Sequence, residues 1–262
     1  SYGALAAIIL QANQNEQHGG QSIPNFDYAM APGVNKSFRK AVNCAIRQYN
    51  RFSGNKEITV KIPEDLAYDD EKAIKKLKLP EGIIESANED VARQTFQAME
   101  GFIHNLNTMH SRAGAQVPFT SINFGTDTSP AGRLVSKCLL EATEDGLGHG
   151  ETPIFPISIF KVKEGVNYNP EDPNYDLFKK SMEVSAKRLF PNFVFIDAPF
   201  NLKSYKPGDY RTEIATMGCR TRVFGSIFPE SDGIATGRGN LSFTTINLVR
   251  LGIKHGIALH ER

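Results

Sequence analysis

Cysteine is scarce in this 262-residue chain, which has only Cys44, Cys138 and Cys219. The three thiols are far apart in the sequence, and none belongs to a Cys-x-x-Cys pair. An odd number of separated cysteines excludes a zinc knuckle made by this segment alone and argues against a disulfide scaffold. We therefore expect reduced thiols in a reducing compartment.

Long apolar runs and an excess of charge are also missing. The longest uninterrupted apolar run covers residues 4–10, whereas a membrane-spanning helix needs about 20 residues. The first ten residues lack the basic region of a signal peptide, so we expect a cytoplasmic location and no membrane partner. The formal net charge is +1, without the basic excess of a general nucleic-acid surface, so no nucleic-acid partner is expected.

The first 112 residues have the apolar periodicity of helices. It predicts helices over residues 3–18, 35–52 and 82–112, and a short helix within the charged segment 55–81. Two glycines and a proline predict an irregular loop over residues 19–27.

Two cysteines and two histidines of the predicted helices are not expected to take part in chemistry. Cys44 and Cys138 lie within helical patterns, where a free cysteine usually serves packing. His104 and His110 are six residues apart, which does not place them on one helical face. The pattern therefore predicts no metal site at these positions.

Beyond residue 112, short β-rich runs alternate with helices. The predicted strands lie within residues 116–126, 152–162, 192–200 and 239–252, with helices at 132–146 and 176–190 and a last helix from residue 253. Such alternation implies right-handed crossovers and a mostly parallel sheet, the α/β class. We expect one unit over residues 1–262, truncated at both ends, with its strand-rich core at residues 113–252.

Three segments rich in glycine and amide side chains lie near predicted strand ends, at residues 17–26, 112–127 and 216–225. Each by itself is consistent with a tight turn, and none matches the Walker or dinucleotide-binding fingerprint. Because α/β folds bind ligands at strand ends, the three together predict a pocket for a polar small molecule.

Five residues of these segments are candidate substrate-binding residues. Glycines allow backbone N–H groups to approach a ligand closely, while amide and hydroxyl side chains supply hydrogen bonds. The candidates are Gly19, Gly20, Gln21, Ser22 and Asn123.

Cys219 has an unusual setting for a packing cysteine, since it follows Gly218 and precedes a basic, turn-like segment. Arg220 and Arg222 would favour a thiolate, but no histidine that could act as a base lies nearby in the sequence. Composition therefore leaves three roles open for Cys219: a nucleophile, a redox thiol or a structural thiol.

Five segments, in this order along the chain, resemble the anaerobic, oxygen-sensitive ribonucleoside-triphosphate reductases, which are glycyl-radical enzymes. The segments are residues 9–32, 111–135, 189–201, 210–223 and 237–248. The resemblance covers residues 2 to about 252. A pyruvate formate-lyase-like glycyl-radical enzyme is the alternative within the superfamily, but it would need adjacent cysteines, and the motif here contains one.

The resemblance implies a fold and three catalytic residues. The fold would be part of a ten-stranded α/β barrel with a finger loop at about residues 211–226, which carries Cys219. Cys219 would become a thiyl radical that abstracts the 3′-hydrogen of the ribose, and this step needs no thiolate. Asn240 would hydrogen-bond ribose hydroxyls or formate, and Met217 would lie near the cysteine. A turn residue and a core methionine remain the alternatives for these two positions.

The resemblance also implies cofactors and partners. The substrate would be a ribonucleoside triphosphate with formate as reductant, and the partners would be a nucleotide effector, a second copy and a radical S-adenosylmethionine activase with an iron–sulfur cluster. The family's glycyl-radical motif and four-cysteine zinc site are not among these residues, and its second active-site cysteine is expected upstream of Ser1. We therefore expect this chain alone to be inactive. A non-catalytic nucleotide-binding or interaction module on the same fold is the alternative function.

Overall fold

The computed structural model describes residues 2–53, 57–218, 221–226, 228, 232–239 and 244–256. Its helices are α1 (Tyr2–Asn13), α2 (Phe26–Phe52), α3 (Glu71–Leu77), α4 (Glu81–Thr108), α5 (Pro130–Asp145), α6 (Tyr175–Arg188) and α7 (Leu248–His255), with a 3-10 turn, η1, at Tyr210–Thr212. Its strands are β1 (Gln21–Ile23), β2 (Thr120–Phe124), β3 (Ile157–Val162), β4 (Asn192–Phe195), β5 (Ala215–Thr216) and β6 (Arg222–Val223). None of the described helices combines the length and apolar character that crossing a membrane requires.

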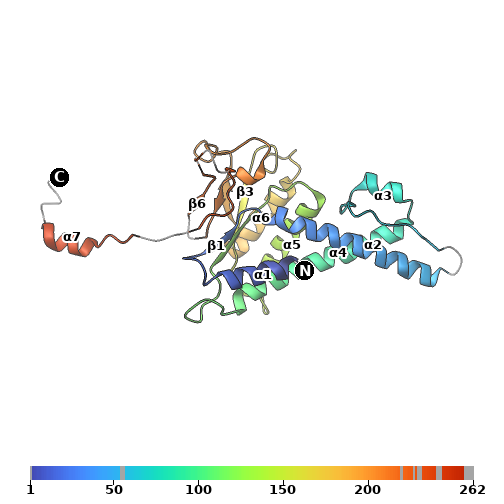
Figure 1. Cartoon of the computed structure of the whole chain (residues 1–262), viewed down its shortest axis with the longest axis horizontal. Coiled ribbons are helices and arrows are strands. Elements are labelled where there is room, and N and C mark those ends of the chain that lie inside the picture. Colours follow the sequence, from blue (N-terminus) through green and yellow to red (C-terminus); the bar gives the residue numbers. More distant parts are fainter. Residues whose placement is uncertain are drawn as a thin grey trace.

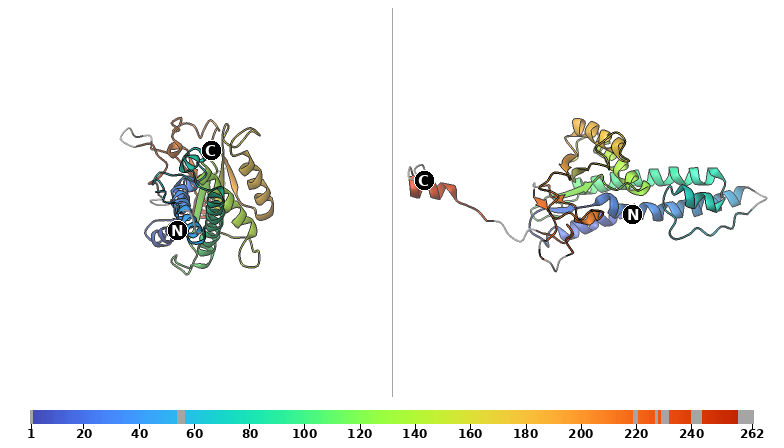
Figure 2. Two further views of the ribbon diagram at one scale, coloured as in Figure 1. Left: turned by 90° about the vertical axis from the view of Figure 1, so that its right-hand side faces the viewer. Right: turned by 90° about the horizontal axis from the view of Figure 1, so that it is seen from above.

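The first four strands form one parallel sheet in the order β1-β2-β3-β4. Each strand pairs with the next one along the chain, and the crossovers run through α2 to α4, through α5 and through α6. Figures 1 and 2 show α2 and α4 lying side by side and extending well beyond the sheet. The predicted α/β class and parallel sheet are confirmed, while the ten-stranded barrel stays a prediction.

The two faces of this sheet have opposite character, because side chains alternate between them along each strand. Ile122, Phe124, Phe160 and Val162 point into the apolar core that α2, α4, α5 and α6 complete. The intervening residues of β2 and β3 include Asn123, and all five residues of β2 are buried. Both faces of the central strands β2 and β3 are therefore covered, one by apolar helix faces and one by a layer that includes polar side chains.

The prediction of an irregular loop over residues 19–27 is wrong in part. Gln21–Ile23 form β1, paired in register with β2, and α2 begins at Phe26 rather than at residue 35. Pro32 lies inside α2 and leaves one helix carbonyl without its usual donor. Local turn signals were outweighed here by tertiary contacts: pairing with β2, and burial of the first turns of α2.

The prediction of a strand over residues 239–252 is also wrong for the residues of this range that the structure describes. Residues 244–247 are not in a strand, and α7 begins at Leu248. The Asn247 side chain caps α7 by accepting from the backbone N–H of Arg250, a start signal that the β-branched residues before it obscured. Every described residue from 244 to 256 is exposed, and Figure 1 shows α7 apart from the sheet.

The remaining predicted elements are found within a few residues of their expected places. The short helix of the charged segment is α3, capped by Asp70, and the strands and helices between residues 116 and 200 are β2, α5, β3, α6 and β4. The first and fourth helices end earlier than predicted, at Asn13 and Thr108. Cys138 is buried in α5, in line with the expected packing role, and Cys44 is half-buried in α2.

Phe160 is the centre of the apolar layer between β3 and the helices. Its ring is fully buried and lies 5.5 Å from Phe124, 6.1 Å from Phe178 and 6.2 Å from Phe193 between centroids. We expect Phe160→Ala to lower the free energy of unfolding by about 3–5 kcal/mol, as measured by urea denaturation. Phe195→Ala removes a ring that is 57% exposed and should change it by less than about 1 kcal/mol. Equal effects would contradict this core.

Burial also protects Cys138, raising the pKa of its thiol to about 12. At pH 8 the thiolate fraction is then about 10⁻⁴, against roughly a quarter for a thiol of ordinary pKa. We expect iodoacetamide to modify Cys138 only after unfolding in urea, and to modify half-buried Cys44 earlier, as followed by mass spectrometry of tryptic peptides. Modification of Cys138 in the folded chain at the rate seen in urea would contradict this.

Candidate active site

A short hairpin covers the polar face of the sheet. Its strands β5 and β6 are antiparallel, and the backbone N–H of Met217 donates to the carbonyl of Thr221 at 2.9 Å. Cys219 and Arg220 lie between these two residues in the sequence, outside the described residues. A two-residue ladder is marginal by itself, so this hairpin depends on its contacts with the sheet.

Asn123 of β2 supplies the main contact. Its Oδ1 accepts from the backbone N–H of Thr216 at 2.8 Å, and its Nδ2 donates to the Thr216 carbonyl at 3.0 Å. The same Nδ2 donates to Ser22 Oγ at 3.1 Å, and Ser22 Oγ donates to the Thr216 carbonyl at 3.2 Å. One amide side chain thus satisfies both backbone groups of a β5 residue, as a neighbouring strand would.

The segment leading to Cys219 is held by a second contact. Ser121 Oγ accepts from the backbone N–H of Gly218 at 3.0 Å and donates to the carbonyl of Gln21 at 3.2 Å. A Cβ on Gly218 would lie 2.5 Å from Ile157 Cδ1 and 3.1 Å from Ile157 Cβ, so a larger residue here would force the Ile157 side chain of β3 to move. The glycine before Cys219 is therefore explained by the sheet beneath it.

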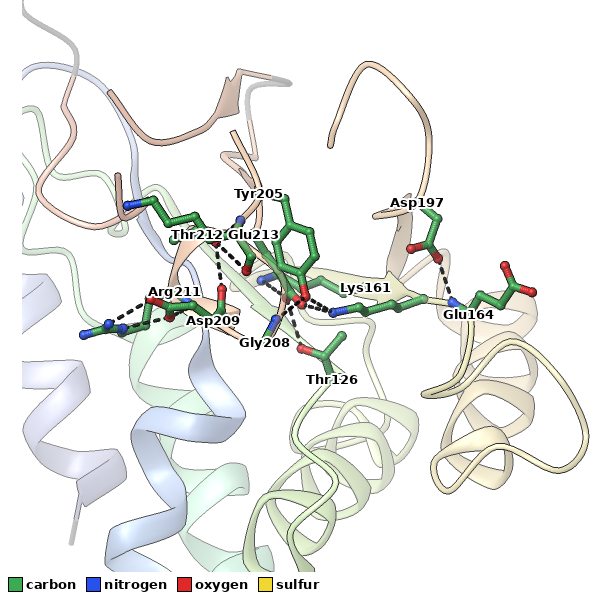
Figure 3. Close-up of polar contacts among 12 residues, drawn as sticks. Thr126, Lys161, Glu164, Asp197, Tyr205, Gly208, Asp209, Arg211, Thr212 and Glu213 are labelled. Atoms are coloured by element: carbon green, nitrogen blue, oxygen red, sulfur yellow. Dashed lines mark hydrogen bonds and ion pairs between the residues drawn. The ribbon is translucent and has the colours of Figure 1, made fainter. Parts of the chain in front are cut away.

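A buried ion network lies under the start of the hairpin (Figure 3). Glu213 Oε2 lies 3.3 Å from Lys161 Nζ, and Glu213 Oε1 lies 2.7 Å from Lys163 Nζ. Thr126 Oγ1 donates to Glu213 Oε2 at 3.4 Å, and Lys161 Nζ donates to Asn25 Oδ1 at 2.7 Å. The Lys161 and Glu213 side chains are both 1% exposed, and a charge buried to this degree requires an opposite charge beside it.

The two lysines differ in their electrostatic setting. Burial lowers the pKa of Lys161, although the nearby Glu213 and Asp27 carboxylates oppose this. Burial also acts against the charged form of Lys163, but its hydrogen bonds to Glu213 and to the Tyr205 hydroxyl outweigh it and raise the pKa of Lys163. Glu213 thus meets one lysine whose pKa burial lowers and one whose pKa its hydrogen bonds raise.

A pocket of about 470 Å³ opens beside the hairpin. Its walls come from α1, from residues 20–24, from the first turns of α2, from β5 and β6, and from residues 235–238. Most of the lining is apolar, and Arg238 is the one charged residue among the described residues that line it. An apolar cavity with a few polar groups and one cation fits a small molecule that carries an anionic group.

The predicted site residues have different positions relative to this pocket. Gly20, Gln21, Ser22 and Met217 line it, from two segments almost 200 residues apart. Asn123 is fully buried below the hairpin. Gly19 is not part of the lining, and Cys219 and Asn240 lie outside the described residues.

The side chain of Gln21 is already engaged within the protein. Its Nε2 donates to the Leu10 carbonyl at 2.7 Å and to Gln14 Oε1 at 3.2 Å, and its Oε1 accepts from Asn13 at 3.3 Å. A Cβ on Gly20 would lie 2.8 Å from the Phe119 ring, so this glycine serves close packing. These contacts explain both residues structurally and leave Ser22 as the β1 side chain nearest to the hairpin.

Sequence reasoning missed Lys161, Glu213 and Arg238. The signal for Lys161 was available, since a lysine inside a buried apolar strand needs a partner. No sequence spacing identifies Glu213 as that partner, because 52 residues separate the two. Arg238 lies within residues 237–248, one of the five segments that carry the family resemblance. Its place at the pocket follows only from the tertiary structure.

Comparison with known proteins identifies the family. The family model described as "Anaerobic ribonucleoside-triphosphate reductase" matches residues 1–260. The chain belongs to the anaerobic ribonucleoside-triphosphate reductase family. The resemblance stated from the five segments is thereby confirmed, and the reductase is favoured over the pyruvate formate-lyase-like alternative.

Individual members of the reductase family are similar over nearly all of this chain. It is 30% identical over 259 residues to the anaerobic ribonucleoside-triphosphate reductase of Enterobacteria phage T4, covering 97% of this chain and 36% of the phage protein. It is 28% identical to the reductases of Haemophilus influenzae and of Escherichia coli K12, covering 96% of this chain and 30% of each. The chain therefore spans about a third of the length of these curated relatives.

The hydrogen bonds of Asn123 give a direct test of the hairpin contact. Asn123→Ala leaves the N–H of Thr216 without its partner and removes one of the hydrogen bonds to the Thr216 carbonyl. We therefore expect the free energy of unfolding, measured by urea denaturation, to fall by about 2–3 kcal/mol. Asn43→Ala removes an exposed amide that donates to the Arg39 carbonyl within α2 and should cost less than about 0.5 kcal/mol. A similar small effect at Asn123 would show that the hairpin does not depend on it.

Proposed function

We propose that these 262 residues supply the hairpin that carries the reacting cysteine, and part of the substrate pocket, of an enzyme that reduces ribonucleoside triphosphates to deoxyribonucleoside triphosphates. One observation carries the proposal. Met217, two residues before Cys219, lines the same pocket as Gly20 and Ser22. Gly237 and Arg238 line it as well, so three of the segments on which the family resemblance rests contribute to one cavity.

The proposed chemistry is a hydrogen-atom transfer. The sulfur of Cys219, as a thiyl radical, takes the 3′-hydrogen atom of the ribose, so an S–H bond forms, a C–H bond breaks and the unpaired electron moves to C3′. The 2′-hydroxyl would then take up a proton and leave as water, and formate, as the proposed reductant, would supply two electrons and a hydrogen and become carbon dioxide. C3′ would finally take its hydrogen atom back from the sulfur, which restores the thiyl radical. The unpaired electron would come from the family's glycyl radical, whose motif is not among these residues.

The residues around the pocket have proposed roles in orienting this step. Asn240 would hydrogen-bond the ribose hydroxyls or formate, and the polarizable thioether of Met217 would tolerate a radical nearby. Arg238 makes no hydrogen bond or ion pair with another described residue, so its guanidinium is free to bind a phosphate or carboxylate. The activase, the nucleotide effector and a homodimer belong to the proposal as partners.

The test is removal of the proposed radical carrier. In the longest polypeptide that carries these 262 residues, activated and assayed without oxygen, Cys219→Ala should reduce deoxyribonucleotide formation to background, because no other atom at that position can hold the radical. Nucleotide binding, measured by isothermal titration calorimetry, should be retained.

The matched control is Cys44→Ala, which removes a half-buried thiol on α2 and should retain product formation. Product formation by Cys219→Ala at the wild-type rate would refute the assignment. Nucleotide binding by a wild-type protein that forms no product under these conditions would favour the non-catalytic binding module instead.

A further inference from the structure

The buried ion network fixes the first residues of the hairpin to the centre of the sheet. Glu213 precedes β5 by two residues, and its side chain lies between Lys161 of β3 and Lys163, which directly follows β3. Figure 3 shows Lys161, Tyr205 and Thr126 gathered around the Glu213 carboxylate. Three segments far apart in the sequence thereby converge on one side chain.

Both lysines are fixed independently of Glu213. Lys161 Nζ donates to Asn25 Oδ1, at the start of α2, and the Lys163 ammonium lies 3.0 Å from the Tyr205 hydroxyl and 4.7 Å from its ring centroid. The carboxylate of Glu213 therefore meets two donors whose positions are set by α2, β3 and the loop around Tyr205. A carboxylate with both oxygens bound to fixed donors has little freedom to shift or rotate.

The other hydrogen bonds between the first half of the hairpin and the sheet are made by the hairpin's backbone. Asn123 binds Thr216, and Ser121 binds the N–H of Gly218, so the contacts at residues 213, 216 and 218 follow one another toward Cys219. In the second strand, Arg222 donates to Asn201 Oδ1 at 3.0 Å and its guanidinium lies 5.1 Å from the centroid of the Phe200 ring, so its contacts are with the loop after β4. Glu213 is thus the first of three successive contacts, and the one that depends on charge.

Stability alone does not account for an ion network in this place. Burying three charged groups has a large desolvation cost, and apolar side chains of similar size often stabilise a fold equally well. In some proteins a buried ion network restricts a segment to one position, and that role fits the place of this network at the start of the hairpin.

We infer that Glu213 is a positioning residue, which through Lys161 and Lys163 sets the place of the hairpin on the sheet and thereby the place of Cys219 at the pocket. The last step rests on the proposed function. Without the Glu213 carboxylate, the hydrogen bonds at Thr216 and Gly218 remain. The segment that leads into β5 is then no longer held on the sheet, so the hairpin can shift relative to the sheet. Displacement by an ångström is enough to slow a reaction that requires contact between two atoms.

The test compares Glu213→Gln with Asp209→Asn, in the longest polypeptide that carries these residues. Both variants convert an acid to its amide, but Asp209 pairs with exposed Arg211 on the surface. Hydrogen–deuterium exchange, followed by mass spectrometry, should be about tenfold faster in peptides from residues 211–226 of Glu213→Gln. Asp209→Asn should match the wild type, and peptides from α4 and α5 should not change in either variant.

The kinetic readout separates positioning from folding. In Glu213→Gln, kcat should fall about tenfold while KM stays within about twofold, because the substrate still binds but meets a displaced sulfur. Asp209→Asn should keep both constants. Unchanged exchange of residues 211–226, or faster exchange with an unchanged kcat, would overturn the inference.

If Glu213→Gln exchanges faster throughout the chain, Lys163→Met distinguishes a local effect from general destabilisation. This variant removes the half-buried ammonium that binds Glu213 and keeps the buried pair of Lys161 and Glu213. Faster exchange confined to residues 211–226 would support the inference, and wild-type exchange there would overturn it. Failure of the proposed function is recognised separately, by product formation in Cys219→Ala. In that case the exchange data still report on the contact between Glu213 and the hairpin.

Discussion

The site depends on one constraint: a two-residue strand must be held on the face of a parallel sheet. Asn123 meets this constraint by bonding both backbone groups of Thr216, and Ser121 continues the contact to Gly218. Parallel sheets are usually apolar on both faces because helices cover them. Here the face that carries the hairpin has hydrogen-bonding side chains instead, and the other face supplies the core.

The polar layer extends beyond the hairpin to the start of α2. Asp27 is fully buried and accepts from the backbone N–H groups of Gly125 at 2.8 Å and Asp127 at 3.0 Å. Burial raises the pKa of Asp27, and these two hydrogen bonds oppose the rise. Thr126, between the two donors, bonds Glu213 through its side chain and the Tyr28 hydroxyl through its carbonyl. The loop after β2 thus connects α2 to the hairpin.

Sequence periodicity was sufficient where an element is long or strongly patterned. β2 and β3 were visible as short β-rich runs, and α5 was visible as the helical segment between them. It failed at β1, where three residues are too few to show alternation. It failed again at α7, because the β-branched residues before the helix have the composition of a strand.

The sequence alone determined the α/β class, the order of its central elements and the family, because these follow from periodicity and from motifs that are local in the chain. It also marked Met217, Ser22 and Asn123 as candidates. Only the tertiary structure decided which of them meet, since the hydrogen bond between Asn123 and Thr216 joins residues 93 positions apart. The same holds for Glu213 and its lysines, because the partner of a buried charge is chosen by how the chain folds in space.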